Sequence, residues 1–165
     1  MNLALHLLFH IFAAGIAGYA VWRFWRCPLI SFGAAFLGGV LIDLDHFIDY
    51  FLAFGFTFNL NYFIHGYQFL KSDKIYILFH GWEYVILLLT VSWLIKSNIK
   101  IKAAVLALAL GMFFHLGIDA VTNEGAQFRT YSIIYRAKNN FDLQPLVTPE
   151  HYQDHQIRKK IFPTL

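Results

Sequence analysis

Residues 3–22 read LALHLLFHIFAAGIAGYAVW and contain no Lys, Arg, Asp or Glu. A helix needs about 20 mostly apolar residues to cross the hydrocarbon of a bilayer. Arg23 and Arg26 close the run at its far end. A signal peptide is the alternative, but no positive charge precedes the apolar residues. The stretch therefore predicts a first membrane-spanning helix.

The composition of the whole chain agrees with a membrane protein. Hydrophobic residues make up 58% and charged residues 14% of the 165 residues, whereas soluble domains are about a quarter charged. The single Cys27 excludes a disulfide framework and a thiolate metal cluster. The net charge is +3, but the basic residues lie at the ends of apolar segments, as membrane flanks do, so we expect no nucleic-acid partner.

Three more apolar segments follow, over residues 28–54, 75–95 and 101–121. Pro28 suits the first turn of a helix, and short basic turns separate segments one from two and three from four. We predict an all-α, polytopic membrane protein: a four-transmembrane-helix bundle over residues 1–125, followed by a juxtamembrane tail over 126–165 that rests on the headgroups.

The ionisable residues within these segments all fall toward one membrane face. Within each segment they are three or four residues apart and therefore share a helical face. An Asp deep in a membrane costs about 2.5–3.5 kcal/mol, so such a group needs compensation by water or cations. The members are His6, His10, Asp43, Asp45, His46, Asp49, His80, Glu83, His115 and Asp119. We predict that they build one site near that face.

Imidazole and carboxylate without thiolate best suit Zn²⁺, then Mn or Fe, whereas Mg²⁺ and Ca²⁺ prefer oxygen ligands. One or two divalent ions fit the number of donors, with one Asp bridging a pair. His10 on its own is explained equally well by hydrogen bonding between helices. The predicted metal ligands are His6, Asp43, Asp45, His46, His80, His115 and Asp119.

Two neighbouring metal ions commonly serve phosphoester hydrolysis. Glu83 and Asp49 are the candidate catalytic bases; alternatively, Glu83 only orients His80, and Asp49 is a solvated acid at a helix end. The sequence predicts a membrane-embedded hydrolase whose partners are membrane lipid and a lipid-borne ester or phosphoester. A metal-ion transporter or a metal-stabilised scaffold is the alternative. The membrane half near the short turns is apolar, which favours a one-sided site over a transport path.

Two motifs carry a family resemblance. The stretch GVLIDLDH at residues 39–46 resembles the L-P-D-I-D-H signature of the YdjM-like inner-membrane metal-dependent hydrolases, and HLGIDAVT at residues 115–122 resembles their H-x-x-x-D-x-x-T motif. An N-terminal His such as His6 is also similar to the family. The resemblance implies a bacterial inner-membrane protein, distantly similar to zinc-dependent phospholipase C, that hydrolyses a lipid or phosphoester.

The chain departs from that pattern at two places. Ile42 stands where the family has Pro, which alters helix geometry but no ligand. The family's middle segment resembles H-R-x-x-T-H-S, with two His, whereas residues 79–83 read FHGWE and hold His80 alone. Glu83, almost a turn later, is the candidate replacement for the missing ligand.

Overall fold

The computed structural model describes residues 3–162 and is all-α, with 77% of the chain helical and no strand in the described range. The predicted all-α class is confirmed. The chain divides into two compact units, Met1–Asp43 with Phe79–Asn123 and Leu44–Leu78 with Glu124–Leu165. The predicted boundary near residue 125 lies where the chain leaves the first unit, but residues 44–78, predicted to belong to the bundle, group with the C-terminal segment.

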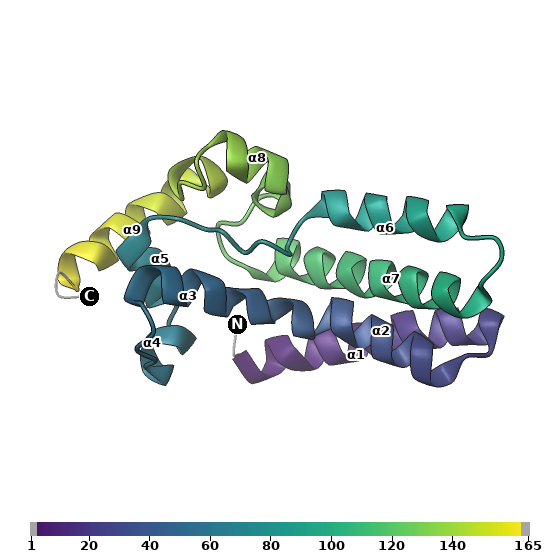
Figure 1. The fold of residues 1–165 in the computed structure, drawn as a ribbon. Coiled ribbons are helices and arrows are strands. Elements are labelled where there is room, and N and C mark those ends of the chain that lie inside the picture. Colours follow the sequence, from purple (N-terminus) through teal and green to yellow (C-terminus); the bar gives the residue numbers. More distant parts are fainter. Residues whose placement is uncertain (1–2, 163–165) are drawn as a thin grey trace. The chain divides into compact units, whose positions relative to one another are not determined.

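The first unit consists of four apolar helices (Figure 1). Helix α7 is its centre, because it packs against each of the other three. The Asn98 side chain starts α7 by accepting hydrogen bonds from the amides of Lys100 and Ile101. The four helices are α1 (Leu3–Trp25), α2 (Pro28–Gly39), α6 (Trp82–Leu94) and α7 (Ile99–Thr122).

Small residues hold α1, α2 and α7 close together. Ala17, Ala35, Ala103 and Ala107 are fully buried in one cluster, and small side chains of this kind let helix backbones approach within a membrane. At Gly111 the approach is very close, since a Cβ there would lie 2.4 Å from the Ala35 carbonyl oxygen, and a Cβ at Gly38 would lie equally close to the Leu108 carbonyl oxygen. Helices α2 and α7 can meet in this way only if residue 111 is glycine.

We expect Gly111→Ala to destabilise the first unit by about 1–3 kcal/mol, because the new methyl group must push α2 away from α7. Gly33→Ala is the matched control on α2: a Cβ at residue 33 meets no described atom within 4 Å. Unfolding in mixed detergent micelles measures both. Equal midpoints for the two variants would contradict the close contact.

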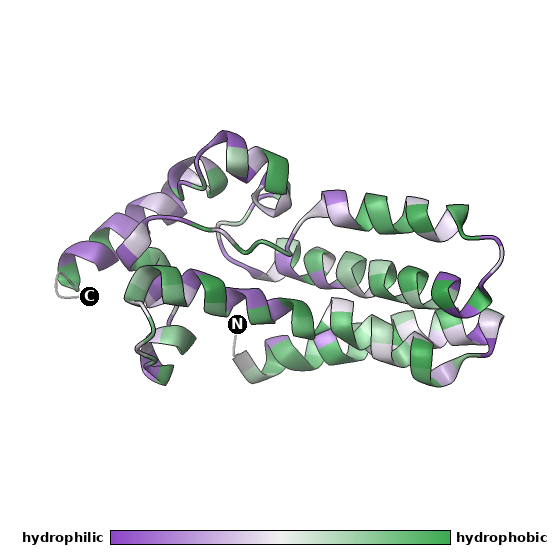
Figure 2. Cartoon of the chain, viewed as in Figure 1, coloured by the Kyte–Doolittle hydropathy of each residue, from purple (hydrophilic) through white to green (hydrophobic). Residues whose placement is uncertain are grey.

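Two helices, Ala4–Trp25 within α1 and Ile99–Thr122, are long and apolar enough to cross a membrane, and both are largely hydrophobic in Figure 2. A third span results if Pro28–Gly39 and Leu41–Phe54 count as one broken span. Helix α6 has 13 residues, about 20 Å, which is short of the ~30 Å hydrocarbon layer. Membrane association is therefore supported, whereas four complete crossings are not confirmed.

The second unit consists of short helices. The 3₁₀ turn η1 (Leu41–Asp45) carries the chain into it from the first unit. The most polar helix is α9, which shows mainly hydrophilic colours in Figure 2. The elements are α3 (His46–Phe54), α4 (Leu60–Ile64), α5 (Tyr67–Ser72), η2 (Phe128–Tyr131), α8 (Ile133–Lys138), η3 (Gln144–Leu146) and α9 (Pro149–Ile161).

Two buried charged side chains explain why the helix predicted to begin at residue 75 begins only at Trp82. Both carboxylate oxygens of Asp49 accept backbone hydrogen bonds, from Tyr76 at 2.7 Å and Ile77 at 2.9 Å. The fully buried Arg136 donates to the Ile77 carbonyl at 2.9 Å. The backbone of this segment is thus satisfied by side chains instead of helical hydrogen bonds.

Asp73, at the C-terminal end of α5, holds α9. His155 contacts its Oδ1 at 2.9 Å and Lys159 pairs with its Oδ2. Partial burial alone would raise the pKa of Asp73, but the hydrogen bonds from Lys159 and His155 outweigh burial and lower it. The pKa of His155 is lowered chiefly by burial, against the attraction of Asp73.

Acid should therefore loosen α9 in two stages. A His with a lowered pKa stabilises the fold while neutral, so stability falls as the pH drops below about 6.5. An Asp with a lowered pKa stabilises it while ionised, so a further loss follows below about pH 4. Because the Asp73 carboxylate is partly exposed, we expect only about a fivefold loss of amide protection in α9. Hydrogen exchange corrected for intrinsic rates measures it. In Asp73→Asn the stage below pH 4 should disappear; its persistence would contradict the assignment.

Candidate metal centre

Six His and Asp side chains meet in the first unit, and their ligand atoms form overlapping groups that could hold a metal ion. Helices α1 and α7 each contribute two of them, and the segments that follow α2 and precede α6 contribute one each. A spacing of four residues places His6 and His10 on one face of α1, and His115 and Asp119 on one face of α7. The six are His6 and His10 on α1, Asp43 in η1, His80 two residues before α6, and His115 and Asp119 on α7.

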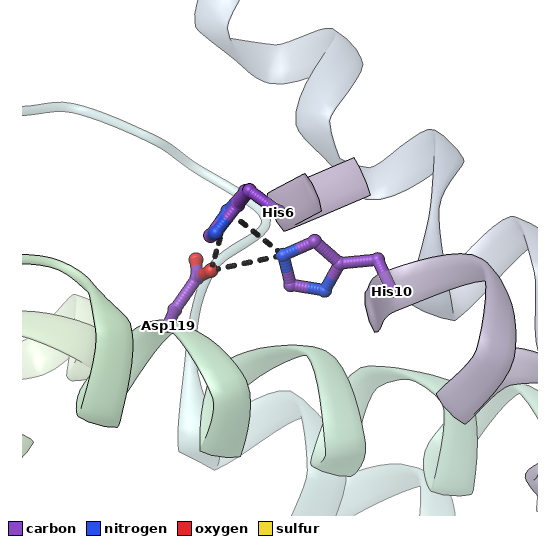
Figure 3. A group of neighbouring side chains, drawn as sticks. All are labelled: His6, His10 and Asp119. Carbon is purple, nitrogen blue, oxygen red and sulfur yellow. Dashed lines mark hydrogen bonds and ion pairs between the residues drawn. The ribbon is translucent and has the colours of Figure 1, made fainter. Parts of the chain in front are cut away.

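The first group surrounds one oxygen of Asp119 (Figure 3). The Nε2 atoms of His6 and His10 each lie 3.2 Å from Asp119 Oδ1. The same two nitrogens are 2.9 Å apart. Two imidazoles on consecutive turns of α1 and one carboxylate oxygen from α7 therefore form a compact triangle.

The second group surrounds the other oxygen. Asp119 Oδ2 lies 3.4 Å from His115 Nε2 and 3.8 Å from His80 Nε2. These nitrogens are 3.0 Å apart, and Asp43 Oδ1 lies 3.2 Å from His80 and 3.3 Å from His115. Four ligand atoms from four places in the sequence thus gather on the far side of the Asp119 carboxylate.

These separations match those between ligands of one tetrahedral ion. Zn–N and Zn–O bonds of about 2.0–2.1 Å with tetrahedral angles place neighbouring donors about 3.3 Å apart. The separations described above run from 2.9 to 3.8 Å. Since Asp119 presents one oxygen to each group, its carboxylate has the position of a bridge between two sites.

The oxygen in the first group is buried without a hydrogen bond. Asp119 is 3% exposed, and Oδ1 finds no hydrogen-bond partner among residues 3–162 although two imidazole nitrogens are close. Burying a carboxylate oxygen without a hydrogen bond raises the free energy of the folded state. A cation among the three atoms satisfies all of them; ion pairing with protonated His is the alternative chemistry for the same contacts.

Contacts around the groups turn the ligand nitrogens inward. His115 Nδ1 lies 3.1 Å from the Gly39 carbonyl oxygen, which can only accept, so Nδ1 carries the proton and Nε2 is left with a lone pair. Thr122 Oγ1 lies 3.4 Å from His6 Nδ1. The His10 ring stacks on His115 with centroids 4.0 Å apart. The imidazoles are therefore held in place by the helices around them.

Burial is uneven across the centre. His10, His80 and His115 are fully buried. The side chains of His6 and Asp43 are 20% and 34% exposed. A reactant therefore has access where His6 and Asp43 reach the surface of the unit.

The other predicted site residues are not among these six. Asp45, His46 and Asp49 belong to the second unit, where Asp49 binds the Tyr76 and Ile77 amides with both oxygens. We therefore give Asp49 no catalytic role. Glu83 lies in the first turn of α6, half-buried and three residues after His80.

His10 is the ligand that sequence reasoning left out of its metal set. Taken alone, a His in an apolar helix is often a packing residue. Its spacing of four residues from His6 was the available signal, because it places both rings on one face of α1.

In comparisons with known proteins, no family model, curated protein or solved structure matches the chain. What can be said of its function therefore rests on the side chains of the centre and on the sequence motifs that supply them.

Proposed function

We propose that the chain is a membrane-embedded, metal-dependent hydrolase that cleaves a phosphoester carried by a lipid, with two Zn²⁺ ions as cofactor. The observation that carries this proposal is that the two oxygens of Asp119 lie near different pairs of imidazoles, Oδ1 near His6 and His10 and Oδ2 near His80 and His115. Pairs of metal ions bridged in this way commonly serve phosphoester hydrolysis. The resemblance of residues 39–46 and 115–122 to YdjM-like hydrolases points to the same chemistry.

The two groups differ in how many protein ligands they offer. His6, His10 and Asp119 Oδ1 would hold one ion with three ligands, and a catalytic zinc site keeps its fourth position for water or substrate. The second ion would have up to four ligands, namely Asp43, His80, His115 and Asp119 Oδ2. Bound divalent ions lower the pKa of a coordinated water and neutralise charge on a phosphoryl oxygen.

The charge of the ligands favours a phosphoester over a neutral ester. Two carboxylates, Asp43 and Asp119, and four neutral imidazoles offset only half the charge of two divalent cations. The remaining positive charge attracts an anionic substrate and stabilises charge that builds up during its hydrolysis. Glu83, beside His80 in sequence, is the proposed general base.

Hydrolysis of two soluble esters tests the proposal. We expect detergent-solubilised protein to cleave the anionic diester bis(p-nitrophenyl) phosphate in preference to p-nitrophenyl butyrate, to lose activity with a chelator and to regain it with Zn²⁺. Asp43→Asn should lower the activity about 100-fold. Asp154→Asn, a change of the same kind at an exposed residue of α9, is the matched control. Stoichiometric metal without any hydrolysis would contradict the enzyme and favour a metal-stabilised scaffold.

A further inference from the structure

An open, apolar groove of about 430 Å³ runs between α1 and α7. Aromatic rings from both helices form its walls, and Gly117 leaves space between them, since a Cβ there would meet no described atom within 4 Å. The lining includes Phe9, Phe12 and Ala13 from α1 and Phe113, Gly117 and Ile118 from α7.

One end of the groove adjoins the candidate metal centre. Thr122 lines the groove, and its hydroxyl contacts His6 Nδ1 at 3.4 Å. Phe9 and Ile118 in the lining are the chain neighbours of the ligands His10 and Asp119. A molecule in the groove therefore has apolar walls along its length and metal ligands at one end, which is the pattern of a lipid with a polar head.

The length of the groove agrees with one lipid chain. From Phe113 to Thr122, nine residues along α7, the helix rises about 13 Å. Half of the ~30 Å hydrocarbon layer is about 15 Å. The groove is thus about one leaflet deep, beginning at the end of α7 that carries Asp119. Exposure of Phe12 at 70% and Val121 at 86% keeps it open to the outside of the unit.

We propose that this groove binds one hydrocarbon chain of the lipid substrate and so places the phosphoester of that lipid at the metal centre. The inference rests on the proposed function and adds the mode of substrate entry: sideways from the leaflet, with the chain between Phe9 and Phe113. A helix of a second copy of the chain is the competing occupant of the same walls.

Gly117→Leu is the test variant, because a Cβ at residue 117 meets no described atom within 4 Å, the larger side chain occupies the groove, and leucine favours the helix. Gly33→Leu is the matched control: its Cβ also meets nothing within 4 Å, and α2 does not contribute to the described lining. Protein is reconstituted in vesicles of phosphatidylethanolamine and phosphatidylglycerol. We expect Gly117→Leu to lower release of headgroup about tenfold, with metal content and bis(p-nitrophenyl) phosphate hydrolysis unchanged. Gly33→Leu should change neither. Unchanged lipid hydrolysis, or an equal fall for both substrates, would overturn the groove and leave the hydrolase standing.

Labelling separates this inference from the proposed function, because it needs no activity. A phosphatidylglycerol with a diazirine in its acyl chain is added to the same vesicles and irradiated. In wild type we expect the tryptic peptide 103–129 to be labelled more than peptide 75–96, which contains α6. That excess should fall about fivefold in Gly117→Leu but not in Gly33→Leu. Equal labelling of the two peptides overturns the groove, as does crosslinking of 103–129 to a second chain, even if lipid hydrolysis is absent.

Discussion

Asp119→Asn should empty the metal centre of both ions. The amide loses the charge and keeps only one carbonyl oxygen, so one side loses its shared ligand and the other has a neutral oxygen in place of a carboxylate. We expect metal content measured by inductively coupled plasma mass spectrometry to fall from about two ions per chain to fewer than about 0.5, and bis(p-nitrophenyl) phosphate hydrolysis to fall about 10³-fold.

The control for this variant is Asp154→Asn, which changes an exposed carboxylate in the second unit and should leave both readouts at wild-type values. Thermal unfolding shows whether the fold persists, since both substitutions conserve size. If Asp119→Asn binds as much metal as wild type, Asp119 is no bridge between two ions.

His10→Leu should remove one ion and leave the other. Leucine keeps the buried volume against the His115 ring but has no nitrogen for the first group, whereas the second group keeps Asp43, His80 and its oxygen of Asp119. We expect about one ion per chain and a loss of activity of about 10²–10³-fold, because a two-ion mechanism loses one of its charges.

The exposed His65 provides the matched control, and His65→Leu should retain both ions. His80→Leu should complement His10→Leu by leaving an ion in the first group. Loss of both ions in His10→Leu and in His80→Leu alike would show a single site, and retention of both would remove His10 from the ligands.

Much of the centre is predictable from the sequence, because the spacing of two residues in a helix determines whether their side chains lie on the same face. Pairs four residues apart, His6 with His10 and His115 with Asp119, share a face whatever the rest of the chain does. The apolar runs around them predict α1 and α7 for the same reason, since the requirement for backbone hydrogen bonds in hydrocarbon favours a helix.

The remaining features depend on contacts between distant segments, and spacing does not contain them. The segment at residues 75–81 is apolar enough for a helix, but Asp49 and Arg136 satisfy its backbone instead. Similarly, hydropathy runs on across Val40, where α2 ends and η1 follows. His46 and Asp45 follow Asp43 closely in sequence, yet they group with the second unit. The sharing of Asp119 between two pairs of imidazoles depends on the packing of α1 and α6 against α7.

X-ray absorption at the zinc edge on the Zn²⁺-loaded, full-length protein tests the shared carboxylate most directly. Two ions held on opposite oxygens of Asp119 predict first-shell nitrogen and oxygen scatterers without sulfur, and a metal–metal distance of about 3.5–4 Å. That metal–metal signal should vanish in His10→Leu while the first shell remains. A wild-type protein that takes up no stoichiometric zinc, or that shows one isolated ion, would contradict the binuclear centre.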